Sequence, residues 1–141
     1  MKILVSACLL GRNCKYNGGN NYDENVVKFL EGKEVFPVCP EVMAGLGIPR
    51  IPIEIVDGHL QNREGNSVDE VLRDAVEQVL ELVKKEKITC CVLKSRSPTC
   101  GVHQVYDGTF SGKLIPGAGV LAKALQDVGC QVWDAEEVEV L

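Results

Sequence analysis

A long amphipathic segment followed directly by a short apolar run constrains the fold of this chain more than any other feature. Between residues 68 and 87, apolar side chains recur at helical spacing, which predicts a helix packed against a core. Its apolar stripe consists of Val68, Val71, Leu72, Ala75, Val79, Leu80 and Val83. Ser67 and Glu70 have the spacing of a capping box at the start of this helix. The continuous apolar run at residues 87–94 is typical of a central parallel strand, buried on both faces.

Strands and helices are predicted to alternate along the rest of the chain. Shorter apolar runs that are typical of strands occur at residues 2–8, 34–39, 53–56 and 130–134. Helical spacing recurs at residues 24–32 and 119–129, and residues 103–117 predict either a short extended pair or an irregular excursion. This alternation favours an α/β fold with a three-layer, Rossmann-like arrangement, in which a mainly parallel sheet carries helices on both faces.

Length, hydropathy and charge narrow the class of protein. The 141 residues predict a single domain spanning residues 1–141. No apolar stretch reaches the length of a membrane-spanning helix, and the first residues lack the pattern of a signal peptide, so a cytoplasmic location is expected. The net charge of −5 argues against a nucleic-acid partner, and nothing in the sequence indicates an oligomeric state.

The seven cysteines fall into two groups by position. An odd number of cysteines in a protein expected in the reducing cytoplasm argues against a disulfide framework. Cys90 and Cys91 lie inside an apolar run and Cys130 opens the last predicted strand, so these three are interpreted as small buried side chains.

The second group lies at or just beyond the ends of predicted strands. Cys8, Cys39 and Cys100 are each followed by loop-forming residues, and Cys14 lies in the same loop as Cys8. Because ligands of open α/β sheets bind at the carboxyl ends of the strands, the three thiolates are predicted to share a metal or cluster site. Three ligands would leave one iron of a cluster open for catalysis, whereas Cys14 as a fourth ligand would make a closed, non-catalytic metal- or cluster-binding module.

Another hypothesis places a cysteine nucleophile at Cys100 with His103 as its base. A separation of three residues in one loop is a poor geometry for such a pair, and no third group that would orient the base is evident. His59 and His103 also lack metal-ligand spacing to a cysteine and are expected to be surface residues.

Four segments in this order resemble the thiouracil desulfidase-like family of small bacterial domains: "VSACLLGRNCKYNG", "VCPEVMAGLGIPRIPIEI", "LKSRSPTCGVHQVYDGTFSG" and "GAGVLAKAL". The resemblance runs from residue 3 to about residue 132. It implies an iron–sulfur enzyme with a 4Fe-4S cluster held by Cys8, Cys39 and Cys100. The implied reaction removes sulfur from a thiolated pyrimidine base such as 2-thiouracil with water, and gives the oxo base and sulfide.

The resemblance also implies roles for polar residues near the cysteines. Glu41 and Ser97 occupy the positions where the family's acid/base pair is expected. Lys94 and Arg50 are predicted to bind substrate and to offset the negative charge of a thiolate-bound cluster, whereas Arg96 is interpreted as a solvated loop charge. The expected partner is a small thiolated base, because the chain lacks the extra domain of relatives that act on thiolated RNA.

Overall fold

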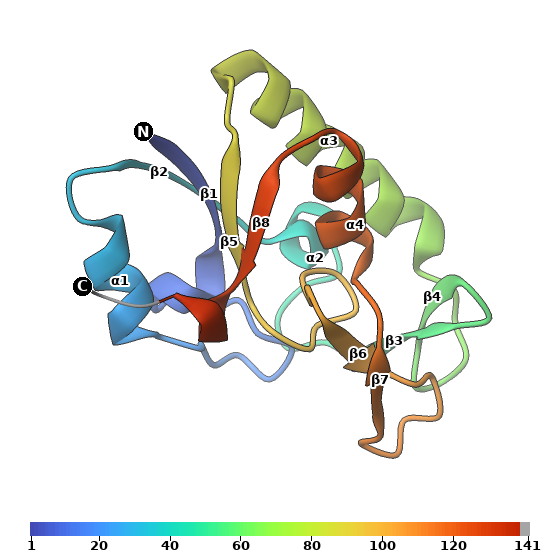
Figure 1. The fold of residues 1–141 in the computed structure, drawn as a ribbon. Coiled ribbons are helices and arrows are strands. Elements are labelled where there is room, and N and C mark those ends of the chain that lie inside the picture. The colour runs from blue at the N-terminus through green and yellow to red at the C-terminus, as the bar shows by residue number, and fades with distance from the viewer. Residues whose placement is uncertain (139–141) are drawn as a thin grey trace.

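A four-stranded parallel sheet forms the centre of the molecule, in a computed structural model that describes residues 1–138 (Figure 1). Its strands, in spatial order, are β2 (Glu34–Val38), β1 (Lys2–Ser6), β5 (Cys90–Leu93) and β8 (Gln131–Asp134). Every neighbouring pair in this sheet is parallel. The predicted strands at these four places are confirmed, although Cys8, Cys39 and Cys130 lie just outside them.

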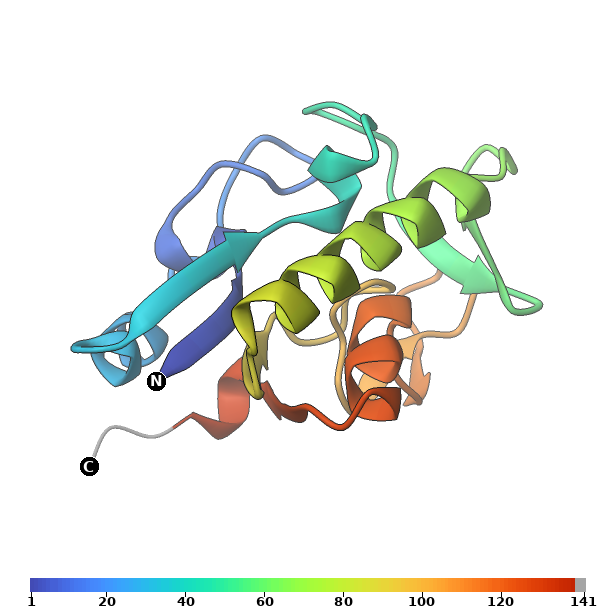
Figure 2. The same ribbon diagram turned by 90° about the horizontal axis from the view of Figure 1, so that it is seen from above.

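Helices cover both faces of the sheet, as expected for three layers (Figure 2). One face packs against α3 (Asp69–Glu86) and α4 (Val120–Asp127), through a core that includes Leu4, Cys91 and Leu121. The other packs against α1 (Glu24–Leu30) and the 3-10 turns η1 (Ala7–Leu10) and η2 (Ala135–Glu137), through a core that includes Ile3 and Val92. Adjacent residues of β1 and β5 serve opposite cores, because side chains alternate across a strand.

The long helix α3 lies where its apolar spacing predicts, with two differences. Its buried residues are Leu72, Ala75, Val76, Val79 and Val83. Val71 of the predicted stripe is 42% exposed, since the buried face is rotated toward Val76. The predicted capping box is wrong: the N-cap is Val68, without a side-chain cap, and the Ser67 hydroxyl contacts only the Asp69 N–H, at 3.4 Å.

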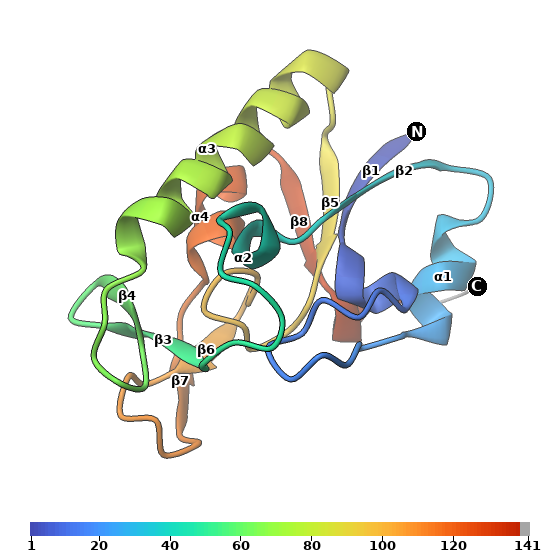
Figure 3. The same cartoon turned by 180° about the vertical axis from the view of Figure 1, so that it is seen from behind.

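Two hairpins and a short helix lie at the carboxyl ends of the strands (Figure 3). The hairpins are β3 (Ile53–Val56) with β4 (His59–Asn62), and β6 (Gln104–Tyr106) with β7 (Leu114–Pro116); the helix is α2 (Pro40–Met43). Asp57 and Gly58 both have positive φ, which is the geometry of a tight two-residue hairpin turn. Of the two alternatives expected for residues 103–117, the structure has the extended pair, whereas β4, with one buried apolar residue, was not predicted.

Two further features concern the outside of the fold. Pro37 lies in β2, an edge strand, where a residue without a backbone N–H is tolerated. None of the helices described in residues 1–138 has the length and apolar character needed to cross a membrane.

Candidate active site

Three cysteines from separate strand ends line one cavity of about 540 Å³. Cys8 lies in η1 directly after β1, Cys39 is the N-cap of α2 directly after β2, and Cys100 lies in the loop after β5. The chain leaves β1 toward β2 on one side and returns to β5 on the other, so the cavity lies at the point where the strand order reverses. The structure therefore brings together the three cysteines that sequence reasoning grouped.

Cys8 is half-buried and Cys100 is buried, and both thiols have partners that favour a thiolate. Burial raises the pKa of Cys8, against which the Asn21 amide, 3.5 Å from the Cys8 sulfur, and the Lys94 cation favour the charged form. Burial also raises the pKa of Cys100, and the Ser6 hydroxyl opposes that rise by hydrogen bonding. Because both pKa values are raised, a metal that binds these thiols must displace their protons.

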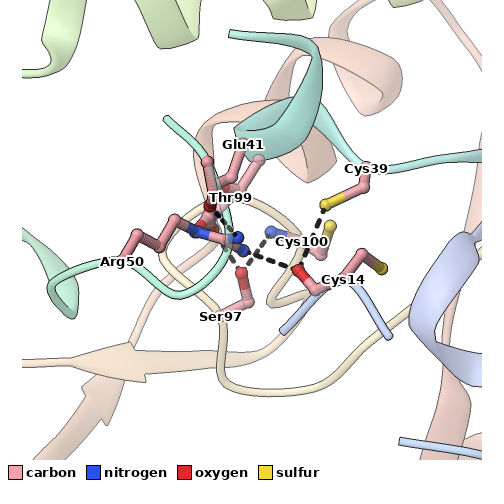
Figure 4. A network of polar contacts seen from close by, with 8 residues as sticks. Cys14, Cys39, Glu41, Arg50, Ser97, Thr99 and Cys100 are labelled. Atoms are coloured by element: carbon pink, nitrogen blue, oxygen red, sulfur yellow. Dashed lines mark hydrogen bonds and ion pairs between the residues drawn. The ribbon is translucent and has the colours of Figure 1, made fainter. Parts of the chain in front are cut away.

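Cys14 is a fourth cysteine at the same cavity. It is buried, and its pKa is raised to about 12, first by burial and then by the neighbouring Cys39 and Cys8. Its carbonyl accepts a hydrogen bond from the Arg50 guanidinium at 2.8 Å and lies 3.8 Å from the Cys39 sulfur (Figure 4). Cys14 therefore contributes a backbone support for Cys39 as well as a thiol.

A buried ion pair joins α2 to the loop before β3 (Figure 4). Glu41 accepts a hydrogen bond from Arg50 Nε at 2.9 Å through one oxygen and from the Thr99 hydroxyl at 3.1 Å through the other. The Arg50 side chain is 7% exposed and the Glu41 side chain 15%. The remaining Arg50 nitrogens bond the carbonyls of Cys14 and Gly47, so its donors are directed at the protein.

Ser97 organises the loop that carries Cys100. Its hydroxyl oxygen accepts hydrogen bonds from the N–H groups of Thr99 and Cys100, both at 3.1 Å. With both acceptor positions used, the hydroxyl proton remains available for donation. Gly101 permits this tight loop, since a Cβ there would lie 2.7 Å from the Ser97 carbonyl oxygen and 2.6 Å from that of Gln104.

The other charged candidates occupy different environments. Lys94 lines the cavity, and its ammonium donates to the carbonyl and hydroxyl of Ser95 at 3.3 and 3.1 Å. Arg96 reaches the cavity rim but forms an exposed ion pair with Glu136, which agrees with its interpretation as a solvated charge. The side chains of His59 and His103 are 73% and 61% exposed, as expected for surface residues.

The thiols surround a cavity instead of converging on a single point. Within residues 1–138, no three Cys, His, Asp or Glu side chains are close enough together to hold one metal ion. The described cysteines are all free, and Cys90 and Cys91 are buried in the sheet as predicted. Cys130 is half-buried and precedes β8, with its sulfur 3.6 Å from the Ile88 carbonyl.

Several cavity residues were missed by the sequence reasoning. Ser6 and Asn21 support the cysteines, and Thr99 supports Glu41. Glu54 could have been recognised from the sequence, because it is a charged residue inside the apolar run of β3. In the structure it is buried. The aromatic part of the wall, Tyr16, Tyr106 and Phe110, comes from loops and a short strand that carry no periodic signal.

Comparison with known proteins gives matches along almost the whole chain. Residues 3–137 match the family model described as 2-thiouracil desulfurase. The "Uncharacterized protein YbbK" of Bacillus subtilis (strain 168) is 35% identical over 146 residues, which cover 96% of this chain and 97% of that protein. A solved structure, the 4Fe-4S-dependent thiouracil desulfidase TudS, matches with a TM-score of 0.91 and 34% identity, over 97% of this chain and 92% of that chain. The structural match confirms the predicted fold class.

Proposed function

Because this chain belongs to the 2-thiouracil desulfurase family, we propose that it removes sulfur from a thiolated pyrimidine base such as 2-thiouracil, giving the oxo base and sulfide. The observation that carries the proposal is the arrangement of Cys8, Cys39 and Cys100 around one cavity at the strand ends. Water supplies the oxygen atom of the product. The exchange of sulfur for oxygen at the same carbon needs no net electron transfer.

The residues around the cavity fit a 4Fe-4S cluster. Thiolates are the usual protein ligands of such clusters, and a group of several metal atoms needs its ligands further apart than a single ion does. The three thiols face a shared space, and no single-ion site was found in residues 1–138. Cys8, Cys39 and Cys100 would hold the cluster. When bound with three ligands, it would supply a Lewis-acidic iron that accepts the sulfur of the thiocarbonyl.

Glu41 and Ser97 are proposed to handle the protons. The Glu41 carboxylate is fixed by Arg50 and Thr99 at the cavity, where it can accept a proton from the water that replaces the sulfur. Ser97 cannot act as an acceptor for substrate while its oxygen bonds two backbone N–H groups. Its O–H donates to no group among residues 1–138 and is therefore suited to donate a hydrogen bond or a proton to the bound base.

The two cations are proposed to have different roles. Lys94 is near Cys8 and lines the cavity, so it is placed to offset negative charge there and to bind the substrate. A direct substrate contact by Arg50 remains a prediction. Its hydrogen bonds to Glu41, Cys14 and Gly47 favour a positioning role instead.

Anaerobic reconstitution with iron and sulfide, followed by measurement of sulfide release from 2-thiouracil, tests this function. The wild type is expected to contain iron and acid-labile sulfide in equal amounts and to release sulfide. Cys8→Ser, Cys39→Ser and Cys100→Ser should each lose the cluster, whereas Cys130→Ser, outside the cavity, is the matched control and should retain it. Bound zinc without acid-labile sulfide would instead support a non-catalytic metal-binding module.

A further inference from the structure

Glu54 presents an unused acceptor atom to the cavity. It lies in β3, is only 8% exposed, and lines the same cavity as the three cysteines. Its Oε1 atom accepts hydrogen bonds from the N–H groups of Gly108 and Phe110, at 2.9 and 3.2 Å. No hydrogen bond reaches its Oε2 atom from residues 1–138, and the carboxylate has no ion-pair partner among them. Since no described polar side-chain atom is both fully buried and unpaired, Oε2 keeps some accessible surface, on a residue that lines the cavity.

Anchoring the β6–β7 loop uses only one oxygen of this carboxylate. Both backbone N–H groups contact Oε1, and a glutamine oxygen could accept the same two hydrogen bonds, although a carboxylate accepts them more strongly. A largely buried negative charge with a free oxygen is unfavourable unless a donor completes it. The charge and the second oxygen therefore point to a ligand that brings an N–H or O–H group.

The surroundings of Glu54 favour a flat, ring-shaped ligand. Tyr106 and Phe110 line the same cavity. Phe110 has φ of 55°, a left-handed conformation that is unusual for a bulky residue, and its N–H is held by Glu54. Aromatic walls with a few directed polar groups are typical of sites for planar small molecules.

We propose that the free oxygen of Glu54 accepts a hydrogen bond from a ring N–H of the pyrimidine substrate, and that Glu54 thereby selects bases with an unsubstituted ring nitrogen. This inference rests on the proposed function and deepens it. In 2-thiouracil the thiocarbonyl carbon lies between two ring N–H groups, so a donor accompanies the reacting sulfur. An amide NH2 group or a cation at this position would direct its own N–H toward the ring N–H of the base, and two donors that face each other repel.

Glu54→Gln tests the inference without removing the loop anchor. The amide oxygen must face the Gly108 and Phe110 N–H groups, which directs the NH2 group into the cavity. We expect the anaerobic holoenzyme of this variant to bind 2-thiouracil and uracil at least about 10-fold more weakly than the wild type, in calorimetric titration. The loss should lie in KM more than in kcat, and the melting temperature should stay near that of the wild type. Glu81→Gln, which removes an exposed carboxylate on α3, is the matched control.

Methylated ligands identify the atom concerned. If Glu54 accepts one ring N–H, then either 1-methyl- or 3-methyl-2-thiouracil should bind weakly to the wild type and show no further loss in Glu54→Gln, because both changes remove the same contact. Equal binding of 2-thiouracil by wild type and Glu54→Gln would overturn the inference. A wild type that binds 2-thiouracil more tightly than the variant does, but releases no sulfide, would leave the inference standing and refute the proposed function. A wild type that binds none of these pyrimidines would overturn both.

Discussion

Replacing Arg50 with methionine removes the guanidinium that joins its own loop to α2 and to the loop of Cys14. The Arg50 side chain is 7% exposed and donates to Glu41, Cys14 and Gly47. Methionine keeps an unbranched apolar chain of similar reach, so the change mainly deletes the charge and the hydrogen bonds. The Glu41 carboxylate then retains only the Thr99 hydroxyl as a partner within the described residues.

The expected loss in free energy of unfolding follows from how deeply Arg50 and Glu41 are buried. Removing one member of a buried ion pair costs about 3–5 kcal/mol, and the lower end applies because the Glu41 side chain is 15% exposed and keeps the Thr99 contact. The buried Cys14 loses the donor to its carbonyl, which adds about 1 kcal/mol, whereas Gly47 is exposed and can bond water. We therefore expect the free energy of unfolding to fall by about 3–4 kcal/mol. This corresponds to a lower melting temperature by roughly 10 °C.

Urea unfolding of the reduced, cluster-free protein measures this change, and the single tryptophan, Trp133 in β8, provides the fluorescence signal. Arg63→Met is the matched control, because Arg63 lines the same cavity, is exposed and has no ion pair among residues 1–138. A double-mutant cycle with Glu41→Gln should give a coupling energy of at least about 1.5 kcal/mol. A loss below about 1 kcal/mol for Arg50→Met, the value of an ordinary surface ion pair, would refute the reasoning.

Two further predictions concern the supports of the fold. The buried environment of Asp69 opposes ionisation, but hydrogen bonds from the Leu60 N–H and Arg73 outweigh it and lower its pKa. The ionised Asp69 should therefore stabilise the fold above its unfolded-state pKa, and this stabilisation should be lost as the pH falls through the lower, folded-state pKa. Urea unfolding between about pH 6 and pH 3 measures this loss. The free energy of unfolding should depend less on pH in Asp69→Asn than in the wild type. Gly101→Ala should destabilise the protein by about 1–3 kcal/mol or more, since its Cβ would lie 2.6–2.7 Å from two backbone oxygens. The control variant Gly19→Ala, whose Cβ meets only a flexible side chain at 3.1 Å, should unfold near the wild-type urea midpoint. Equal midpoints for the two variants would contradict this prediction.

The elements with strong periodic patterns could be predicted from the sequence. The stripe of α3 and the apolar run of β5 reflect burial in a core, and burial determines which residues can occupy those positions. The helix start was predicted to within one residue, but the capping box was not: Val68 is the N-cap without a side-chain cap, and the first-turn residue Asp69 bonds the Leu60 N–H of the preceding hairpin. β4 carries one fully buried apolar residue, Leu60. Its sequence therefore lacks the alternation of apolar and polar residues that would have predicted a strand paired with β3.

The site could be predicted in part for a similar reason. Parallel strands bring their carboxyl ends together, so the convergence of Cys8, Cys39 and Cys100 follows once the strands are identified. The contacts of Arg50 could not be predicted, because its partners lie in loops whose paths have no periodic signal. The same limit applies to Glu54, whose neighbours come from the β6–β7 loop.

Pro37 has a consequence for how copies of the protein meet. β2 forms one border of the sheet, and an uncovered border offers backbone groups on which a strand from another molecule can add. Pro37, the fourth of the five β2 residues, takes one donor out of that row, so a fifth strand would find an interrupted ladder there. This residue therefore acts against the addition of a strand from a second copy at the β2 border.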